Sequence, residues 1–340
     1  MSYQREGGWT RRSFLGGLTL AGTAELLGLR PRLVAAEPPP ETATLRLDQW
    51  PAICFAPKYV AEELLRSEGF TEVQYVKTET AVALQKALAS GDAHFSLQPA
   101  GVFVPWLDTG DPIIVLAGLH VGCYELFGTD RVHTIRDLQG KTVSVSALGS
   151  GRHAFLASML AYVGLDPRKD SHLVTPSPAD SMQLLAAAKI DAFMAFPPEP
   201  QELRAKHIGH VIVNTALDRP WSQYFCCMVV GNREFVRKQP VATKRWLRAI
   251  LKAADICTLE PERVGRLLVE KGYTKSYDYA LQTVKEIPCD KWREYDPEDT
   301  VCFYALRLYE AGMITSSPQK IIAQGMDWRF LKELRRELKG

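Results

Sequence analysis

The chain has 340 residues, of which 46% are hydrophobic and 24% are charged, and its formal net charge at pH 7 is +2. This composition is that of a globular protein. Basic residues form no run interleaved with aromatic ones, which argues against nucleic acid as a partner. Seven cysteines occur without any C-x-x-C spacing, which argues against a zinc knuckle.

The first 36 residues have the pattern of an export signal. Residues 10–15 read Thr-Arg-Arg-Ser-Phe-Leu, a twin-arginine sequence, and a glycine-rich apolar run follows over residues 15–29. That run is too short and too rich in glycine to span a bilayer well. Small residues before Glu37 predict cleavage near Ala36. We therefore expect a periplasmic protein exported by the twin-arginine route, whose mature part begins with a proline-rich linker at residues 37–43.

The next segment predicts strands that alternate with helices. Residues 44–50 alternate in polarity like a strand, Pro51 breaks it, and apolar residues at helical spacing then continue to Gly69. Further strands are expected at 73–76 and 113–119, with helices between the strands. This alternation predicts a parallel sheet covered by helices on both faces. Ligands of such sheets lie beyond the carboxyl ends of the strands.

Residues 134–196 predict a second, smaller α/β unit. A strand at 141–146 leads into a glycine-containing turn, in which Ser150 is placed to cap the following helix. A glycine–serine turn at a helix N-terminus favours binding of an anion. The remaining expected elements are strands at 172–175, 191–196, 210–214 and 225–231, a helix at 179–188, a long helix lined by Trp246, Ile250, Ala254 and Cys257, and helices around 301–308 and 328–338.

Several segments resemble one protein family. Residues 137–192 contain the pattern D-L-x-G-K-x-V-x-V, G-S, L-x-x-x-G-L-D-P and L-x-x-x-K-I-D-A. This pattern resembles the second lobe of periplasmic substrate-binding proteins of ABC importers, of the nitrate/sulfonate/taurine type. That type also contains the binders of thiamine-pyrimidine precursors. Residues 50–61 and 225–240 are similar to the family's first strand-loop-helix and to its return into the first lobe, and the resemblance covers most of residues 44–270.

The resemblance implies a two-lobed α/β fold, the type 2 periplasmic binding protein, with a ligand cleft between the lobes. Lobe 1 would comprise residues 44–122 and 228–340, and lobe 2 residues 123–227. The implied function is capture of a small organic solute, anionic or planar, and its delivery to an ABC transporter permease. We expect a monomer that touches the membrane only through the permease, with no cofactor, no metal and no catalytic residue.

The expected ligand contacts lie where strands lead into helices. The backbone N–H groups around Ser150 would bind a negative group, and Arg152 would add a bidentate contact. In the alternative interpretation, Ser150 only caps its helix and Arg152 is solvated. The residues expected at the ligand are Trp50, Cys54, Phe55, Gln98, Cys123, Gly149, Ser150, Gly151, Arg152, Glu199, Trp221, Tyr224 and Cys226.

The cysteines allow three interpretations. Cys54, Cys123 and the pair Cys226–Cys227 fall where the fold brings the chain to the cleft. Free cysteine usually behaves as a small buried apolar residue. The other interpretations are a soft thiol site for a ligand or metal, and a disulfide in the cleft. Because Cys226 and Cys227 are adjacent in a predicted strand, we expect their side chains on opposite faces.

The cysteine pair also suggests an enzymatic alternative. It resembles part of the cysteine-rich strand of the fungal pyrimidine synthase of thiamine biosynthesis, an enzyme with the same fold. The match is partial, because the region around Gln98 lacks the histidine that this enzyme places there, and His94 and His120 stand in other contexts. Scattered Ser, His and Asp residues show no triad signature. Solute binding is therefore the expected function, with a synthase-like enzyme as the alternative.

Overall fold

Alternating buried leucines place the first strand, β1 (Thr44–Gln49), inside a five-stranded sheet. The structure is a computed structural model that describes residues 37–78 and 80–339. The chain divides between Pro38 and Pro39, and every element below belongs to the second unit. The expected signal peptide at residues 1–36 lies outside the described residues.

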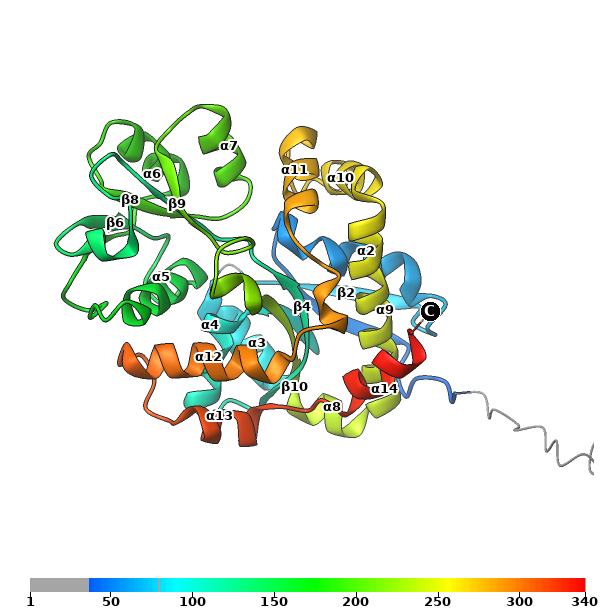
Figure 1. The fold of residues 1–340 in the computed structure, drawn as a ribbon. Helices are drawn as coiled ribbons and strands as arrows, with labels where there is room; N and C mark the ends of the chain where they lie inside the picture. Colours follow the sequence, from blue (N-terminus) through cyan, green and yellow to red (C-terminus); the bar gives the residue numbers. More distant parts are fainter. Residues whose placement is uncertain (1–36, 79, 340) are drawn as a thin grey trace, which may run out of the picture. The chain divides into compact units, whose positions relative to one another are not determined.

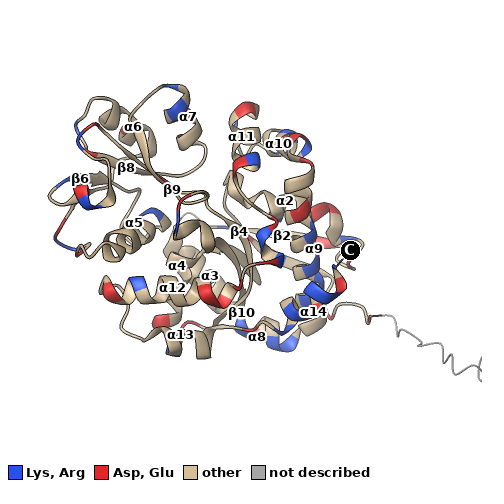
Figure 2. Ribbon diagram, in the orientation of Figure 1, with Lys and Arg blue, Asp and Glu red and all other residues tan. Residues whose placement is uncertain are grey.

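The first sheet has the order β2-β1-β3-β10-β4. Its other strands are β2 (Glu72–Lys77), β3 (Phe95–Pro99), β4 (Ile113–Val121) and β10 (Phe225–Asn232). β1 pairs in parallel with β2 and β3, but β10 is antiparallel to both β3 and β4. The expectation of a parallel sheet is therefore wrong for β10, which enters this sheet from the opposite direction. β4 and β10 carry no Lys, Arg, Asp or Glu (Figure 2) and are buried throughout, although β4 is the last strand in the order of the sheet.

The second sheet has the order β7-β6-β8-β5-β9 and is drawn mainly in green (Figure 1). Its strands are β5 (Glu125–Gly128), β6 (Thr142–Ser144), β7 (His172–Val174), β8 (Ala192–Ala195) and β9 (His210–Asn214). β6 pairs in parallel with β7 and β8, whereas β5 is antiparallel to β8 and β9. The chain passes from the first sheet to the second at residues 122–124 and returns at residues 215–224.

Helices surround both sheets. The α-helices are α2 (Ala56–Leu65), α3 (Ala81–Ser90), α4 (Ala100–Asp108), α5 (Gly151–Tyr162), α6 (Pro178–Ala186), α7 (Glu199–Ala205), α8 (Arg233–Lys238), α9 (Pro240–Leu259), α10 (Pro261–Glu270), α11 (Tyr277–Glu286), α12 (Pro297–Glu310), α13 (Pro318–Gly325) and α14 (Arg329–Glu337). Short 3-10 helices are η1 (Ile53–Phe55), η2 (Ile135–Leu138), η3 (Trp221–Gln223) and η4 (Lys291–Arg293).

The long helix α9 shows how the sequence pattern becomes core. Trp246, Ile250 and Cys257 are buried, as their helical spacing predicts, and the helix packs along α2. Burying one such large apolar side chain stabilises the fold by about 1.5–3 kcal/mol. Leu331 and Leu334 do the same on α14, whose other face is charged. None of the helices in the described part of the chain combines the length and the apolar character needed to cross a bilayer.

Candidate functional site

Five strand ends surround one cavity of about 440 Å³. They are the carboxyl ends of β1, β2 and β3 in the first sheet and of β6 and β8 in the second, which is where α/β sheets bind ligands. The cavity is lined by Trp50, Phe55, Thr80, Ala81, Val82, Leu84, Gln98, Pro99, Val102, Tyr124, Ser146, Ala147, Leu148, Ser150, Gly151 and Phe196.

The lining is aromatic and carries no formal charge. Trp50 and Phe55 contribute from the first strand-helix turn, and Tyr124 and Phe196 from the second sheet. The Tyr124 ring packs on Phe155 and on Phe196, with ring centroids 4.4 and 5.2 Å away. Burial raises the pKa of the Tyr124 hydroxyl well above its ordinary value, so this group stays protonated. The walls therefore favour a ligand with a planar or apolar part.

Two exposed apolar side chains stand at the cavity. Val82, in the first turn of α3, is 59% exposed, and Leu148, in the loop after β6, is 69% exposed. They come from segments that border the two sheets. Exposed apolar groups beside an apolar cavity mark a surface whose burial, by a ligand or by a closing segment of the protein, is favourable.

Three helices begin at this cavity. Thr80 caps α3 by accepting a hydrogen bond from the Ala83 N–H at 3.1 Å, and α4 begins directly after Pro99. Ser150 caps α5 by accepting one from the His153 N–H at 3.3 Å. The first N–H groups of a helix have no partner inside the helix, and its dipole favours negative charge there. The helix N-termini can thus receive an anionic group in a cavity without charged side chains.

The start of α5 is set by close packing. The Ser150 hydroxyl donates to the carbonyl oxygen of Ala147 at 2.6 Å, and the Gly149 N–H donates to His153 Nδ1 at 3.0 Å. A Cβ atom at Gly151 would overlap the Tyr124 hydroxyl, so glycine is required at this position. The capping interpretation of Ser150 is confirmed. Because the Ser150 hydroxyl proton is already donated to Ala147, the donors at the start of the helix that could receive an anion are backbone N–H groups.

Arg152 and Glu199 form a buried pair beside the cavity and do not line it. Arg152 Nη2 donates to Glu199 Oε1 at 2.8 Å, Nη1 donates to Glu199 Oε2, and Nη1 also donates to the Met194 carbonyl oxygen at 3.0 Å. Glu199 Oε2 further accepts from the Phe196 N–H at 3.0 Å. Arg152 is thus bound to Glu199 rather than solvated, and the pair positions Phe196, one wall of the cavity.

The structure brings together some of the expected ligand residues and separates others. Trp50, Phe55, Gln98, Ser150 and Gly151 line the cavity, and the Gln98 amide donates to Ser96 Oγ at 2.8 Å. Gly149, Cys54, Cys123 and Cys226 are not among the lining residues.

Trp221 and Tyr224 lie at another place. The Trp221 ring packs against Tyr162 with centroids 5.5 Å apart, and the Tyr224 ring stacks on Phe303 at 4.1 Å. Tyr224 lines a separate polar cavity of about 600 Å³ together with Arg219 and acidic residues of the segment 294–299. These two aromatic residues therefore pack against α5 and α12 and do not close over the aromatic cavity.

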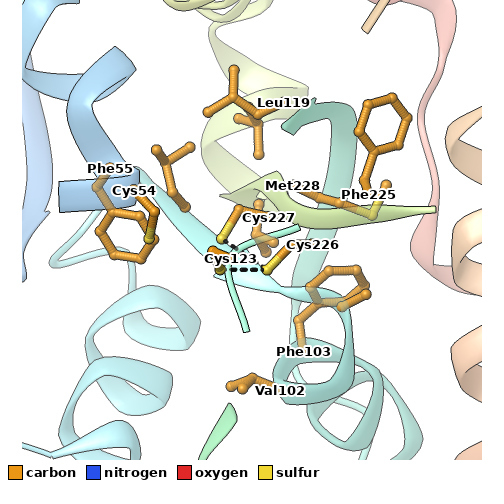
Figure 3. Packing of buried hydrophobic residues seen from close by; sticks show 14 of the residues in the cluster. Cys54, Phe55, Val102, Phe103, Leu119, Cys123, Phe225, Cys226, Cys227 and Met228 are labelled. Atoms are coloured by element: carbon orange, nitrogen blue, oxygen red, sulfur yellow. Dashed lines mark hydrogen bonds between the residues drawn. The ribbon is translucent and has the colours of Figure 1, made fainter. Parts of the chain in front are cut away.

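Four cysteines converge beside the first crossover. The Cys123 and Cys226 sulfur atoms lie 2.9 Å apart, and the Cys226 and Cys227 sulfur atoms 3.9 Å apart (Figure 3). The expectation that Cys226 and Cys227 point to opposite faces is wrong, because register shifts flank Cys227 where β10 pairs with β4 and interrupt the strand alternation. Cys54 belongs to the same group.

The pKa values of Cys227 and of the neighbouring His120 differ from those expected for buried groups without charged or hydrogen-bonding neighbours. Burial alone would raise the pKa of Cys227, but hydrogen bonds from the thiols of Cys123, Cys226 and Cys54 hold it well below its ordinary value. Burial alone would lower the pKa of His120, but the neighbouring Cys227 raises it to about 9.

Some lining residues were missed by sequence reasoning. Ser146 and Phe196 were assigned to strand ends without a role, although the rule that ligands lie beyond strand ends applies to both. Thr80 and Val82 follow β2 in the same way. Tyr124 follows the crossover, and its place at the cavity depends on its packing with Phe155, which the sequence does not show.

Comparison with solved structures identifies the fold class. The periplasmic nitrate-binding protein NrtA from Synechocystis PCC 6803 has a TM-score of 0.74 at 16% identity, over 89% of this chain and 90% of that chain. The alkanesulfonate-binding protein SsuA from Xanthomonas axonopodis pv. citri, bound to MOPS, has 0.68 at 17% identity, over 86% and 100%. The Candida albicans CA3427 gene product, which exhibits the generic periplasmic binding protein fold, has 0.65 at 15% identity, over 84% and 96%. The chain thus has the periplasmic binding protein fold.

Sequence comparison then gives the family. Residues 38–266 match the model of the NMT1-like family, and the chain belongs to this family. A search of curated proteins gave no match. The matched segment contains both sheets and the whole lining of the aromatic cavity.

Proposed function

We propose that this protein is the extracytoplasmic solute-binding component of an ABC importer and that its solute binds in the aromatic cavity. The observation that carries the proposal is an uncharged aromatic cavity at the carboxyl ends of strands from both sheets. The fold and the family support it, since the nitrate-binding and alkanesulfonate-binding structures to which the chain is similar are periplasmic binders.

The lining suggests the class of solute. A planar or alkyl part would pack between Trp50 and Phe55 on one side and Tyr124 and Phe196 on the other. An anionic group, such as a sulfonate or carboxylate, would face the N-terminus of α5, where backbone N–H groups rather than a side-chain cation receive it. Small inorganic anions alone would leave most of the cavity unfilled.

Binding would close two lobes around the solute. We assign residues 44–122 and 225–340 to one lobe and residues 123–224 to the other; the return lies three residues earlier than the expected 228, because β10 begins at Phe225 in the first sheet. Arg204 in α7 donates to both carboxylate oxygens of Glu286 in α11 at 2.7 and 2.8 Å, and Gln201 also donates to Glu286 at 2.8 Å. These bonds join the proposed lobes and would help to hold the closed state.

The same proposal covers location and partners. The protein would reach the periplasm by the twin-arginine route with cleavage near Ala36, act as a monomer, and deliver its solute to a permease. It would perform no chemistry, so the released solute would be unchanged. The synthase-like alternative is not favoured, because the similar solved structures are mostly binding proteins.

A thermal-shift screen tests this function. The purified chain is heated with alkyl sulfonates, aryl sulfonates, aryl carboxylates, nitrate and an aminopyrimidine. A ligand that binds only the folded state raises the melting temperature in proportion to the logarithm of its concentration. We expect stabilisation by a planar or alkyl anion, with the solute recovered intact by mass spectrometry. Conversion of the stabilising compound would instead establish an enzyme, and the absence of any stabilisation would contradict the proposed solute class.

A further inference from the structure

Five buried metal-ligating groups meet at the crossover between the sheets. Cys54 belongs to η1, Cys123 lies two residues after the end of β4, and Cys226 and Cys227 lie at the start of β10. The sulfur atoms of Cys54, Cys123 and Cys227 all lie within 4.8 Å of one another. The sulfur atoms of Cys226 and Cys227 and a ring nitrogen of His120 form a second such triangle. Cys227 is the corner that the two triangles share.

The backbone departs from regular geometry to make this cluster. Cys123 has a φ of 133°, a conformation that residues other than glycine rarely adopt. Register shifts on either side of Cys227 bring its sulfur and that of Cys226 together (Figure 3). Strain of this kind persists where the surrounding structure fixes it and concentrates at functional sites. Cysteines that served only as small core residues would not need it.

His120 supplies an independent observation. Its ring is fully buried, and its Nε2 atom has no hydrogen-bond partner among residues 37–78 and 80–339. Its Nδ1 atom lies 3.4 Å from the Val121 carbonyl oxygen. Leaving a buried polar atom without a partner destabilises the folded state. Packing accounts for buried cysteines but not for an unpartnered imidazole nitrogen beside them.

We propose that Cys54, Cys123 and Cys227 bind one thiophilic d10 metal ion, Zn²⁺ or Cu⁺, with Cys226 or His120 as the fourth ligand. Thiolate and imidazole groups prefer such soft ions. Bonds of about 2.3 Å place the sulfur atoms of a tetrahedral zinc site roughly 3.8 Å apart. The Cys226–Cys227 distance of 3.9 Å is close to this spacing, whereas the Cys123–Cys226 distance of 2.9 Å would have to widen if both bound the ion. Each coordinating thiol releases its proton to solvent, and no oxidation state changes. The proposal does not depend on the solute of the aromatic cavity.

Metal uptake by the full chain tests the proposal. The reduced, chelator-stripped protein receives Zn²⁺ in one arm and Cu⁺ under anaerobic conditions in the other. Because the cluster is enclosed, each ion is supplied both to the folded chain and during refolding. Elemental mass spectrometry after gel filtration measures the ions retained. We expect one equivalent in at least one arm, its loss in Cys227→Ala, and its retention in Cys257→Ala, which removes a similarly buried thiol on α9.

Several results would overturn the proposal. They are a wild-type chain that retains neither ion, a Cys227→Ala chain that retains as much as wild type, and a wild-type chain that forms a Cys123–Cys226 disulfide although the ion is present during refolding. If Cys227→Ala fails to fold, X-ray absorption of the loaded wild-type chain decides. A shell of at least three sulfur atoms at about 2.3 Å supports the site, and a shell of only oxygen and nitrogen overturns it.

Discussion

The aromatic cavity and the buried polar groups behind it are neighbours with opposite properties. The cavity has a volume of about 440 Å³, carries no charged side chain, and exposes Val82 and Leu148. Behind it, Arg152 and Glu199 are bonded to each other, and the space beside Cys123 is about 10 Å³, room for roughly one water molecule. The comparison shows that the charged groups lie in a supporting layer, the buried Arg152–Glu199 pair behind the cavity wall, while the cavity surface itself is apolar. Substitutions in the two layers should therefore have separable effects.

The largest effect is expected for Arg152→Ala in the supporting layer. Removing the guanidinium leaves the Glu199 carboxylate buried without its partner, which destabilises a protein by about 3–5 kcal/mol. Urea unfolding measures this loss. Arg168→Ala, which breaks a surface pair with Asp166, serves as the control and should lower stability only slightly, because water screens that pair. Lost solute affinity with unchanged stability would instead make Arg152 a ligand contact.

A pH effect should also appear outside the cavity. Burial lowers the pKa of His94 to about 4, helped by the nearby Arg46. In the unfolded chain His94 becomes protonated near pH 6.5, whereas in the folded chain it stays neutral down to about pH 4. Protonation therefore favours the unfolded state between these two values. The free energy of unfolding should fall as the pH is lowered from about 6.5 to about 4. His94→Gln should flatten this slope in unfolding experiments, and His172→Gln, at an exposed position, should not. Equal slopes in both variants would exclude His94 as the cause.

The cavity layer should respond in affinity. Trp50→Ala removes half of one aromatic wall and should weaken solute binding by about 2 kcal/mol, with a smaller change in stability. Trp328→Ala is a matched control, because that indole is also half-buried but lies at the start of α14. Calorimetric titration measures both. If the two variants bind equally well, Trp50 makes no contact with the solute.

The smallest effect is expected at the Ser150 cap. Ser150→Ala removes an N-cap and should lower stability by about 1 kcal/mol, as should Ser177→Ala at the start of α6. Because the Ser150 hydroxyl donates to Ala147, we expect a smaller loss in affinity than in stability. An affinity loss above about 1 kcal/mol, the worth of one hydrogen bond, would show that the hydroxyl binds the solute directly.

Sequence reasoning predicted what depends on local pattern. The strand-end rule placed Trp50, Phe55 and Gln98 at the cavity, and the cap at Ser150 was predicted from its turn. Most element boundaries differ by one or two residues. Two antiparallel pairings were missed, that of β10 with β4 and that of β5 with β8. Strand direction depends on how the chain crosses between the sheets, which local pattern does not show.

Other features depend on tertiary contacts that a single sequence does not reveal. Arg152 and Glu199 are 47 residues apart, and nothing in their local patterns indicates that they pair. Tyr224 is an aromatic residue of the kind that often contacts ligands, but its ring stacks on Phe303, which lies far along the chain. The convergence of Cys226 and Cys227 results from a strand irregularity that overrides the alternation of side chains.

Blocking the cavity tests most directly whether it is the solute site. Ala147 is exposed and lines the cavity, so Ala147→Trp should fill the space without disturbing the core. Ala186→Trp, at an exposed position on α6, is the control. Calorimetric titration with the solute found by thermal shift should detect no binding to Ala147→Trp and normal binding to Ala186→Trp. Normal binding to Ala147→Trp would contradict the account and place the solute elsewhere.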